Sequence, residues 1–345
     1  MNPLLAGYCS PVASGNRASS LGNTSNFVNR HDLILSSLGV GTYLGHDDET
    51  TQNRIVNALC SLVDAGLNVI DTAPNYRNGH SESAVGSALQ RTCLEKGIPR
   101  NSLFVSTKVG IVSEYYDSSK YDTIDNRFCF EPSFIFESVE NSRIRMGVET
   151  IDCLYIHNFD EAQVFIAPEK LEEKVNSIFH TMKLLVDREM IRFVGLATWD
   201  GLRVASDHPA HVSLADWVQI AASNGLGGHF GFIQLPVGVW APEALMLPMQ
   251  FCPEENTKVP ALEMARRMGL GVMANSSLYQ GELLTVVPPR FSSNYKLSLA
   301  QHFVQWTRSL SQVDVLLLGM KSRESVHDGK ELMMIPKSTE IVLSV

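Results

Sequence analysis

Short apolar runs and amphipathic segments alternate along most of this chain. Eight runs rich in Val, Ile, Leu and Phe predict strands at 38–43, 67–71, 103–108, 151–157, 191–197, 230–235, 271–275 and 313–318. Between them, apolar residues three and four apart predict helices at 51–66, 80–91, 133–147, 170–188, 210–222, 257–268, 298–310 and 322–332. In the first helix Ile55, Leu59 and Leu62 share one face, and Gly66 is typical of a residue that ends a helix.

Strands that alternate with helices form βαβ units, which build a parallel sheet through right-handed crossovers. Eight such units predict a closed (β/α)8 barrel of the TIM type, a single domain over 33–345 with long loops at the C-terminal ends of its strands. An open doubly wound sheet is the alternative, and its usual mark is a G-x-G-x-x-G turn after the first strand. In 39–45 and 225–231 the last glycine comes one place too late, so a plain loop is the better interpretation.

The first 32 residues are rich in Ser, Asn and Gly and have no clear period. They predict an N-terminal arm that lies on the surface or is partly mobile. This start lacks the basic and apolar regions of a signal peptide, and the late apolar run 313–320 is far shorter than the roughly 20 residues of a membrane span. No two of the six cysteines form a C-x-x-C pair, and free buried thiols are expected. We therefore expect a cytoplasmic protein that has no membrane contact.

The composition is that of an ordinary globular protein, with 44 % hydrophobic and 19 % charged residues among 345. Asp and Glu outnumber Lys and Arg by 37 to 28, a net charge of −9. This acidic balance argues against nucleic acid as a partner, because broad contact with phosphates needs a basic surface. A small anionic ligand remains compatible, since a few cations and backbone N–H groups suffice to bind it.

Polar residues end three successive predicted strands. Asp71 ends the second strand, Lys108 the third and His157 the fourth, and Tyr76 follows Asp71 closely. The C-terminal ends of barrel strands meet at one rim, where barrel enzymes carry their chemistry. Taken singly, each residue has a plainer explanation: a turn or helix-capping Asp, a packed Tyr, a solvated Lys and a hydrogen-bonded His.

Together the four residues suit proton transfer to a carbonyl group. A Lys ammonium beside a Tyr hydroxyl favours the phenolate and is expected to lower the Tyr pKa toward neutrality. Asp71 would hold Lys108 charged and in place. Tyr76 would then act as general acid, and His157 would orient the carbonyl oxygen and support its developing negative charge.

The chain resembles the aldo-keto reductases from about residue 33 to about residue 332. The family's Asp–Tyr–Lys–His tetrad corresponds in order and spacing to Asp71, Tyr76, Lys108 and His157. The segments GVGTY, DTAPNY, STKVG, LYIHN, RFVGLATW, FIQLP and LLLGMKS also stand where the family has counterparts.

The resemblance implies a (β/α)8 barrel, NADPH as cofactor with NADH possible, and reversible reduction of an aldehyde or ketone to an alcohol. By position, Gly41, Thr42 and Asp71 would line the nicotinamide end, and Thr198 and Gln234 would bind the carboxamide. The loop of Asn275, Ser276, Leu278 and Gly281 would cover the pyrophosphate, and Gly319, Lys321 and Ser325 would face the adenosine 2′ end. A helix N-terminus beside a Lys is itself a natural phosphate site.

The chain departs from the family at several positions. Ala197 stands where a Ser of a Ser-Asn pair is common, and Asn275 replaces an aromatic residue that stacks on the nicotinamide. Ser325 stands where many NADPH-preferring members have Arg or Gln, so the preference for NADPH depends mainly on Lys321 and Arg323.

Two loops are candidates for substrate selection. The loop 109–132 is either a lid over the site or a surface excursion packed by its own aromatic residues. The loop 236–253 predicts an apolar wall of the pocket, with contacts to the core or to another subunit as the alternative. Cationic residues are few in both, which disfavours a strongly anionic substrate and favours an uncharged or moderately polar carbonyl compound.

Two other functions stay open beside carbonyl reduction: an NAD(P)-dependent sugar or alcohol dehydrogenase, and a cofactor-binding regulatory subunit with little turnover. The sequence leaves the oligomeric state open. It shows no set of residues with metal-ligand spacing, no G-x-S-x-G turn and no phosphate-binding loop of the Walker type, so no metal site is expected.

Overall fold

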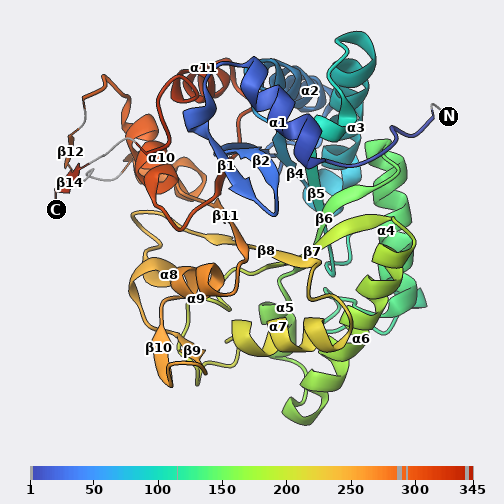
Figure 1. The fold of residues 1–345 in the computed structure, drawn as a ribbon. Coiled ribbons are helices and arrows are strands. Elements are labelled where there is room, and N and C mark those ends of the chain that lie inside the picture. Colours follow the sequence, from blue (N-terminus) through green and yellow to red (C-terminus); the bar gives the residue numbers. More distant parts are fainter. Residues whose placement is uncertain (1–2, 115, 286–289, 293, 339–341, 345) are drawn as a thin grey trace.

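Eight parallel strands close into a barrel in the computed structural model, which describes residues 3–114, 116–285, 290–292, 294–338 and 342–344 (Figure 1). The strand order is β11-β13-β3-β4-β5-β6-β7-β8, and β8 pairs with β11 to complete the circle. All eight predicted strands lie in this barrel, so the (β/α)8 fold is confirmed and the open doubly wound sheet is wrong.

The elements follow one another as strand and helix around the barrel. The barrel strands are β3 (Leu38–Gly41), β4 (Val69–Asp71), β5 (Phe104–Val109), β6 (Ile151–His157), β7 (Ile191–Ala197), β8 (Phe230–Pro236), β11 (Gly271–Asn275) and β13 (Val315–Leu318). The larger helices outside it are α2 (Glu49–Asp64), α3 (His80–Gln90), α4 (Pro132–Met146), α6 (Pro168–Asp187), α7 (Leu214–Ser223), α9 (Ala261–Arg267), α10 (Leu299–Ser309) and α11 (Arg323–Leu332). Helix α11 packs beside α2, so the last βα unit lies against the first (Figure 1).

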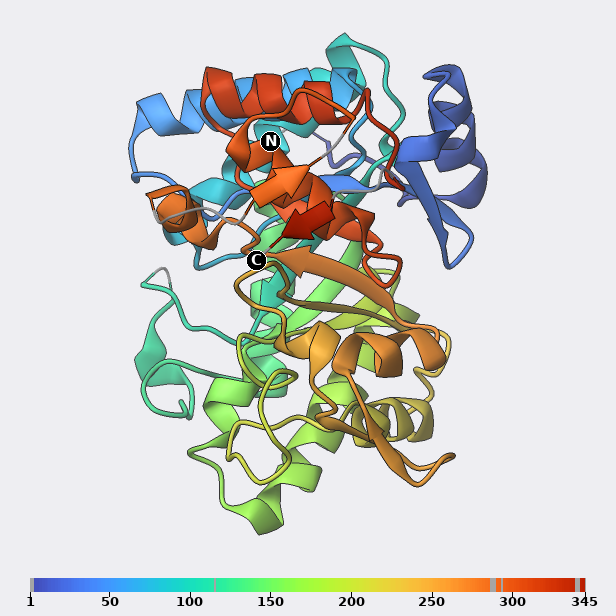
Figure 2. The ribbon, with the colours of Figure 1, turned by 90° about the vertical axis from the view of Figure 1, so that its left-hand side faces the viewer.

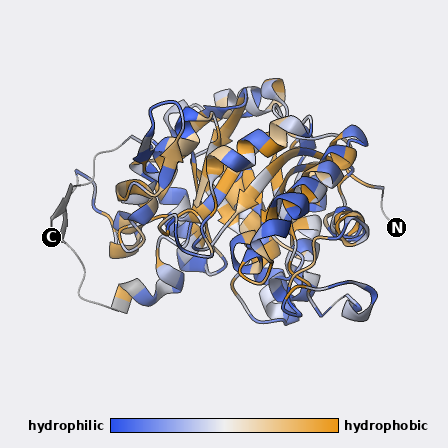
Figure 3. Cartoon of the chain, turned by 90° about the horizontal axis from the view of Figure 1, so that it is seen from below, coloured by the Kyte–Doolittle hydropathy of each residue, from blue (hydrophilic) through white to orange (hydrophobic). Residues whose placement is uncertain are grey.

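The core has two layers, one inside the barrel and one between the strands and the helices. Apolar strands gather at the centre of the molecule, and hydrophilic residues lie toward the outside (Figure 3). Large side chains such as Phe104, Tyr155 and Phe232 fill the barrel interior and are fully buried. Gly195 on β7 makes room for them, because a Cβ there would lie 2.4 Å from the Tyr155 ring.

The N-terminal segment 1–32 contains regular structure that its sequence did not indicate. It holds helix α1 (Pro11–Ser20) and strand β1 (Phe27–Arg30), which pairs with β2 (Leu33–Ser36) as an antiparallel hairpin. His31 in the hairpin turn contacts Phe193 and Phe232, near the starts of β7 and β8. The hairpin therefore covers the end of the barrel opposite the C-terminal rim. It also spans residues 32 and 33, so the domain boundary expected there stays a prediction.

Short elements interrupt the loops of the second half. The segment 257–268 is only partly helical, since its first residues form β10 (Thr257–Val259), which pairs with β9 (Gln250–Cys252) ahead of α9. The remaining short elements are α5 (Phe159–Gln163), α8 (Glu243–Met246), β12 (Arg290–Ser292) and β14 (Val342–Ser344). Within the described ranges, no helix has both the length and the apolar character needed to cross a lipid bilayer.

The loop 109–132 packs against its neighbouring helices. Phe128 and Phe130 are fully buried, Tyr121 contacts Phe134 of α4, and Arg127 pairs with Glu161 of α5 at 2.9 Å. Figure 2 shows this loop in teal beside the green helical segments. These contacts favour the surface excursion over the lid; Tyr115 lies outside the described residues.

Asp160 anchors the loop that follows β7. Its carboxylate is fully buried, and its Oδ2 accepts hydrogen bonds from the backbone N–H groups of Trp199, Asp200 and Gly201 at 3.1, 2.9 and 2.9 Å. Its Oδ1 has no partner among the described residues. Burial is the main influence on this carboxyl and, with the nearby charge of Glu161, outweighs the backbone hydrogen bonds, so the pKa of Asp160 rises to about 6.

Asp160 should make stability depend on pH between about 4 and 6. The folded chain holds this proton more tightly than the unfolded chain, so the stabilisation is complete at low pH and is lost as the pH rises through 6. Relative to Asp160→Asn, the wild type should therefore gain about 2 kcal/mol of unfolding free energy between pH 7 and pH 4. Urea unfolding of both proteins at the two pH values measures this double difference, in which the groups they share cancel. A difference that does not change with pH would contradict the assignment.

Candidate functional site

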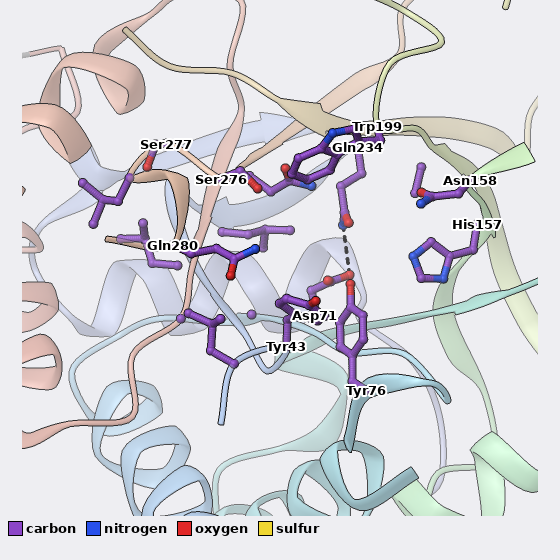
Figure 4. Close-up of a pocket in the computed structure, with 18 of the residues that line it drawn as sticks. Tyr43, Asp71, Tyr76, His157, Asn158, Trp199, Gln234, Ser276, Ser277 and Gln280 are labelled. Carbon is purple, nitrogen blue, oxygen red and sulfur yellow. Dashed lines mark hydrogen bonds between the residues drawn. The ribbon is translucent and has the colours of Figure 1, made fainter. Parts of the chain in front are cut away.

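A cavity of about 580 Å³ opens at the C-terminal ends of the barrel strands. Asp71 at the end of β4, His157 at the end of β6 and Gln234 near the end of β8 reach it from three sides of the barrel. Tyr76 joins them from the turn after β4 (Figure 4). The structure thus brings the predicted acid and two predicted partners to one cavity, at the rim where their strands end.

Asp71 is the hydrogen-bonding centre of this site. Its Oδ2 accepts a hydrogen bond from Lys108 Nζ at 2.5 Å, and its Oδ1 accepts from Ser106 Oγ at 2.8 Å and from Gln234 Nε2 at 3.0 Å. Lys108 also donates to the Thr72 carbonyl oxygen at 2.9 Å. Lys108 is 1 % exposed and does not line the cavity. It therefore acts on a ligand only indirectly, through its interactions with Asp71 and Tyr76.

The Tyr76 ring lies between the buried ion pair and His157. The Lys108 ammonium is 5.1 Å from the centre of the Tyr76 ring, and the rings of Tyr76 and His157 are 6.1 Å apart in an edge-to-face arrangement. Tyr43 packs edge-on against Tyr76 from the other side, with 5.0 Å between the ring centres. These contacts position the hydroxyl-bearing ring before any substrate arrives.

Burial determines the protonation states of Tyr76 and His157. It raises the pKa of Tyr76 above its ordinary value, although the charge of Lys108 and a hydrogen bond with it act in the opposite direction. The expectation that Lys108 brings this pKa toward neutrality is therefore wrong, because desolvation outweighs the ammonium. Burial, with a smaller effect of Lys108, also holds the pKa of His157 well below its usual range. At neutral pH both residues thus carry an ordinary neutral proton donor, a phenol and an imidazole.

Lys108 keeps its charge despite its surroundings. Burial is the largest single influence and would lower the pKa of Lys108, but the attractions of Asp71 and Tyr76 and the hydrogen bonds to them together raise it. A cationic Lys108 beside a neutral Tyr76 stabilises any negative charge that develops on the phenol oxygen during proton transfer.

The cavity also presents buried polar atoms without partners among the described residues. They are Asn75 Oδ1, Thr198 Oγ1, Asn275 Oδ1 and Ser277 Oγ. A buried polar atom costs about 1–3 kcal/mol when it has no hydrogen bond, so such a group points to a polar ligand. The carboxamide and ribose hydroxyls of a nicotinamide cofactor match these atoms chemically, so the residues present fit the expected group.

Most of the predicted cofactor residues line the cavity. They are Gly41, Asp71, Thr198, Gln234, Asn275, Ser276, Leu278, Gly281 and Gly319. Thr42 lies beside it, with its hydroxyl bonded to Thr72 Oγ1 at 2.8 Å. Ser325 lies outside it in the first turn of α11, where its backbone N–H donates to Oγ of the N-cap residue Ser322 at 3.1 Å. Lys321 precedes this cap and reaches toward Gly45, so it too lies beyond the cavity.

The loop 236–253 does not form the expected apolar wall of this cavity. None of its described residues lines the 580 Å³ space. Trp240 instead lines a second cavity of about 430 Å³, which shares Trp199, Ser276 and Ser277 with the first. Met246, Leu247 and Phe251 are exposed.

Several lining residues were not predicted. Tyr43, Asn75 and Asn158 stand next to motif residues in the chain, and Trp199 follows Thr198 directly. Their nearness to the motif was a usable signal, but the sequence does not say which neighbours turn inward. Gln280 comes from the loop after β11, and its left-handed backbone (φ +59°) turns the chain there. Across the described ranges, no group of three or more His, Cys, Asp or Glu residues could hold a metal ion.

Known proteins share this architecture. An aldo-keto reductase of Klebsiella pneumoniae, solved in complex with NADPH, superposes with a TM-score of 0.61 over 89 % of this chain and 90 % of its own, at 18 % sequence identity. At that identity the likeness concerns the fold.

Curated relatives match over shorter stretches. An NADH-specific methylglyoxal reductase of Escherichia coli is 32 % identical over 145 residues, which are 40 % of this chain and 42 % of the relative. An aldo-keto reductase of Alternaria alternata is 28 % identical over 193 residues, 52 % of this chain and 48 % of the relative. The matched part thus spans about half the length of these relatives or less.

A family model described as the Aldo/keto reductase family matches residues 37–223, which carry β3 to β7, the Asp71–Lys108 pair, Tyr76 and His157. The match covers more than half of the chain, which therefore belongs to the aldo/keto reductase family.

Proposed function

We propose that this protein is an NAD(P)H-dependent oxidoreductase that reduces an uncharged aldehyde or ketone to an alcohol. One observation carries the proposal: the Tyr76 phenol and the His157 imidazole meet at a cavity directly in front of the buried Lys108–Asp71 ion pair. A binding protein has no need for a proton donor placed beside a buried cation in this way.

Each residue has one task in this mechanism. The cofactor, when bound, supplies the hydride to the carbonyl carbon. Tyr76 donates its hydroxyl proton to the carbonyl oxygen, and His157 donates a hydrogen bond that orients the same oxygen. Lys108 stabilises the developing charge on Tyr76, and Asp71 holds Lys108 in place. The same groups run in reverse when an alcohol is oxidised, so sugar or alcohol dehydrogenation is the same chemistry in the other direction.

Thr198, Gln234 and Asn275 are the proposed partners of the cofactor's carboxamide end. Gln234 Nε2 already donates to Asp71, and Thr198 and Asn275 line the same cavity and each carry a buried oxygen without a partner among the described residues. No aromatic residue follows β11 directly, since Asn275 ends this strand. Trp199 lines the cavity from the end of β7 and is the proposed source of an aromatic face.

Tyr76→Phe should reduce carbonyl turnover by about 100- to 10,000-fold, because it removes the proton donor and leaves the ring in place. The Kd for NADPH, measured by quenching of tryptophan fluorescence, should change less than about twofold, because the hydroxyl is not needed to bind the cofactor. Tyr121→Phe is the matched control, since Tyr121 bonds to Glu137 at the surface and should leave turnover unchanged. If the wild type binds NADPH tightly and reduces no carbonyl compound in a broad panel, the regulatory-subunit alternative would replace this proposal.

Lys321→Ala should weaken NADPH about tenfold and leave NADH unchanged, because only NADPH carries a 2′-phosphate that an ammonium can bind. Partial burial and repulsion from Arg77 lower the pKa of Lys321, a cost that a bound phosphate relieves. Lys330→Ala, at the other end of α11, is the matched control. Isothermal titration with each cofactor measures the effect, and equal losses for both cofactors would refute this role.

A further inference from the structure

The second cavity lies beside the first, between the loops after β7, β8 and β11. Its volume is about 430 Å³, and Trp199, Ser276 and Ser277 line both cavities. A ligand that reacts at Tyr76 and extends past these shared residues therefore enters the second cavity. Figure 4 shows Trp199 close to Ser276 at the edge of the catalytic cavity.

Three large aromatic side chains contribute to its lining. Trp199, Trp240 and Tyr279 come from three different loops and are 37, 48 and 50 % exposed. Trp and Tyr side chains bury about 150–250 Å² when covered. Trp240 and Tyr279 line only the second cavity, so a cofactor in the first cavity leaves them bare, which is costly unless a further ligand covers them.

Hydrogen bonds fix the backbone at each of these aromatic residues. Asp160 binds the N–H groups of Trp199 and its two successors, and Arg203 Nε donates to the Trp199 carbonyl oxygen at 2.9 Å. Trp240 stands in a tight turn closed by a hydrogen bond from the Ala241 N–H to the Gly238 carbonyl oxygen at 3.1 Å.

The turn of Trp240 is also packed against the loop that carries Tyr279. A Cβ on Gly238 would lie 3.2 Å from Ser277 Cα, so the glycine permits this close approach. The Tyr279 N–H donates to the Ser276 carbonyl oxygen at 2.8 Å. The three aromatic residues thus form a preorganised site, which lowers the entropic cost of binding.

The charge of the second cavity is balanced. Its one cation among the described lining residues, Arg203, pairs with Asp200 at 2.8 Å and with Glu243 at 2.9 Å. The Arg203 side chain is only 13 % exposed, so its charge is committed to these partners. An anionic ligand would find no available cation there, and an uncharged ring suits the site.

We propose that the second cavity binds an uncharged aromatic ring that a short linker joins to the reacting carbonyl group. The inference rests on the proposed function for the reaction itself. It assigns Trp240 as a specificity-determining residue and the substrate as an aryl-bearing aldehyde or ketone that is longer than the catalytic cavity.

The test uses a series of ω-phenylalkanals of increasing chain length, each compared with the unbranched alkanal of equal carbon count. Once the linker reaches the second cavity, the phenyl compound should have a KM about tenfold lower than its alkanal. Trp240→Ala should abolish this advantage for the long phenyl compounds. Phe251→Ala is the matched control, since Phe251 is 47 % exposed on a neighbouring strand and lines neither cavity.

The outcomes separate the subsite from the reaction. Turnover of alkanals with no phenyl advantage at any length, or an advantage that Trp240→Ala leaves intact, would overturn the subsite and leave the proposed function standing. If no aldehyde is reduced, the matching ω-phenylalkanols still decide the matter as ligands, by saturation-transfer NMR. Ring contacts that are lost in Trp240→Ala and kept in Phe251→Ala would support the subsite without turnover, and ring contacts equal in all three proteins would overturn it.

Discussion

The ion pair between Lys108 and Asp71 is the interaction on which the site depends. Both side chains are removed from water, and such a pair is tolerable only when further hydrogen bonds satisfy the remaining donors and acceptors. Asp71 therefore takes hydrogen bonds from Lys108 and Ser106 on β5 and from Gln234 on β8, on the other side of the barrel. These hydrogen bonds connect the ends of β4, β5 and β8 around one neutralised ion pair. The Tyr76 ring packs against the Lys108 ammonium of this pair.

Burial and charge set the protonation states of different residues at this site. Burial keeps Tyr76 and His157 neutral and able to donate protons, while Asp71 keeps Lys108 cationic. Lys108 acts against burial on the Tyr76 pKa and so makes the phenol a stronger acid, while burial keeps it protonated at neutral pH. Thr198 and Asn275 at the same cavity carry buried polar atoms without partners among the described residues, and the polar groups of a ligand can satisfy such atoms.

The rim beyond the catalytic cavity is built by contacts between distant parts of the chain. Asp160, three residues after His157, holds the backbone that carries Trp199, and Gly238 lets the turn of Trp240 approach Ser277. Neither contact has a local signature. A buried Asp in a short helix reads as an ordinary capping residue, and Gly238 reads as an ordinary loop glycine. For this reason the loop 236–253 lines the second cavity and not the first, since apolar composition does not say which cavity a loop faces.

The sequence by itself determined the barrel and the residues at its reactive rim, because strand and helix periods are local and the ends of parallel strands must converge. Asp71, Lys108 and His157 were therefore predictable from strand ends and Tyr76 from its place just after Asp71, while the cofactor residues came from the family resemblance. Only the tertiary structure decided the N-terminal hairpin, the packing of the loop 109–132 and the sign of the Tyr76 pKa shift. These depend on solvent exclusion and on contacts between distant segments, and a pattern of neighbouring residues contains neither.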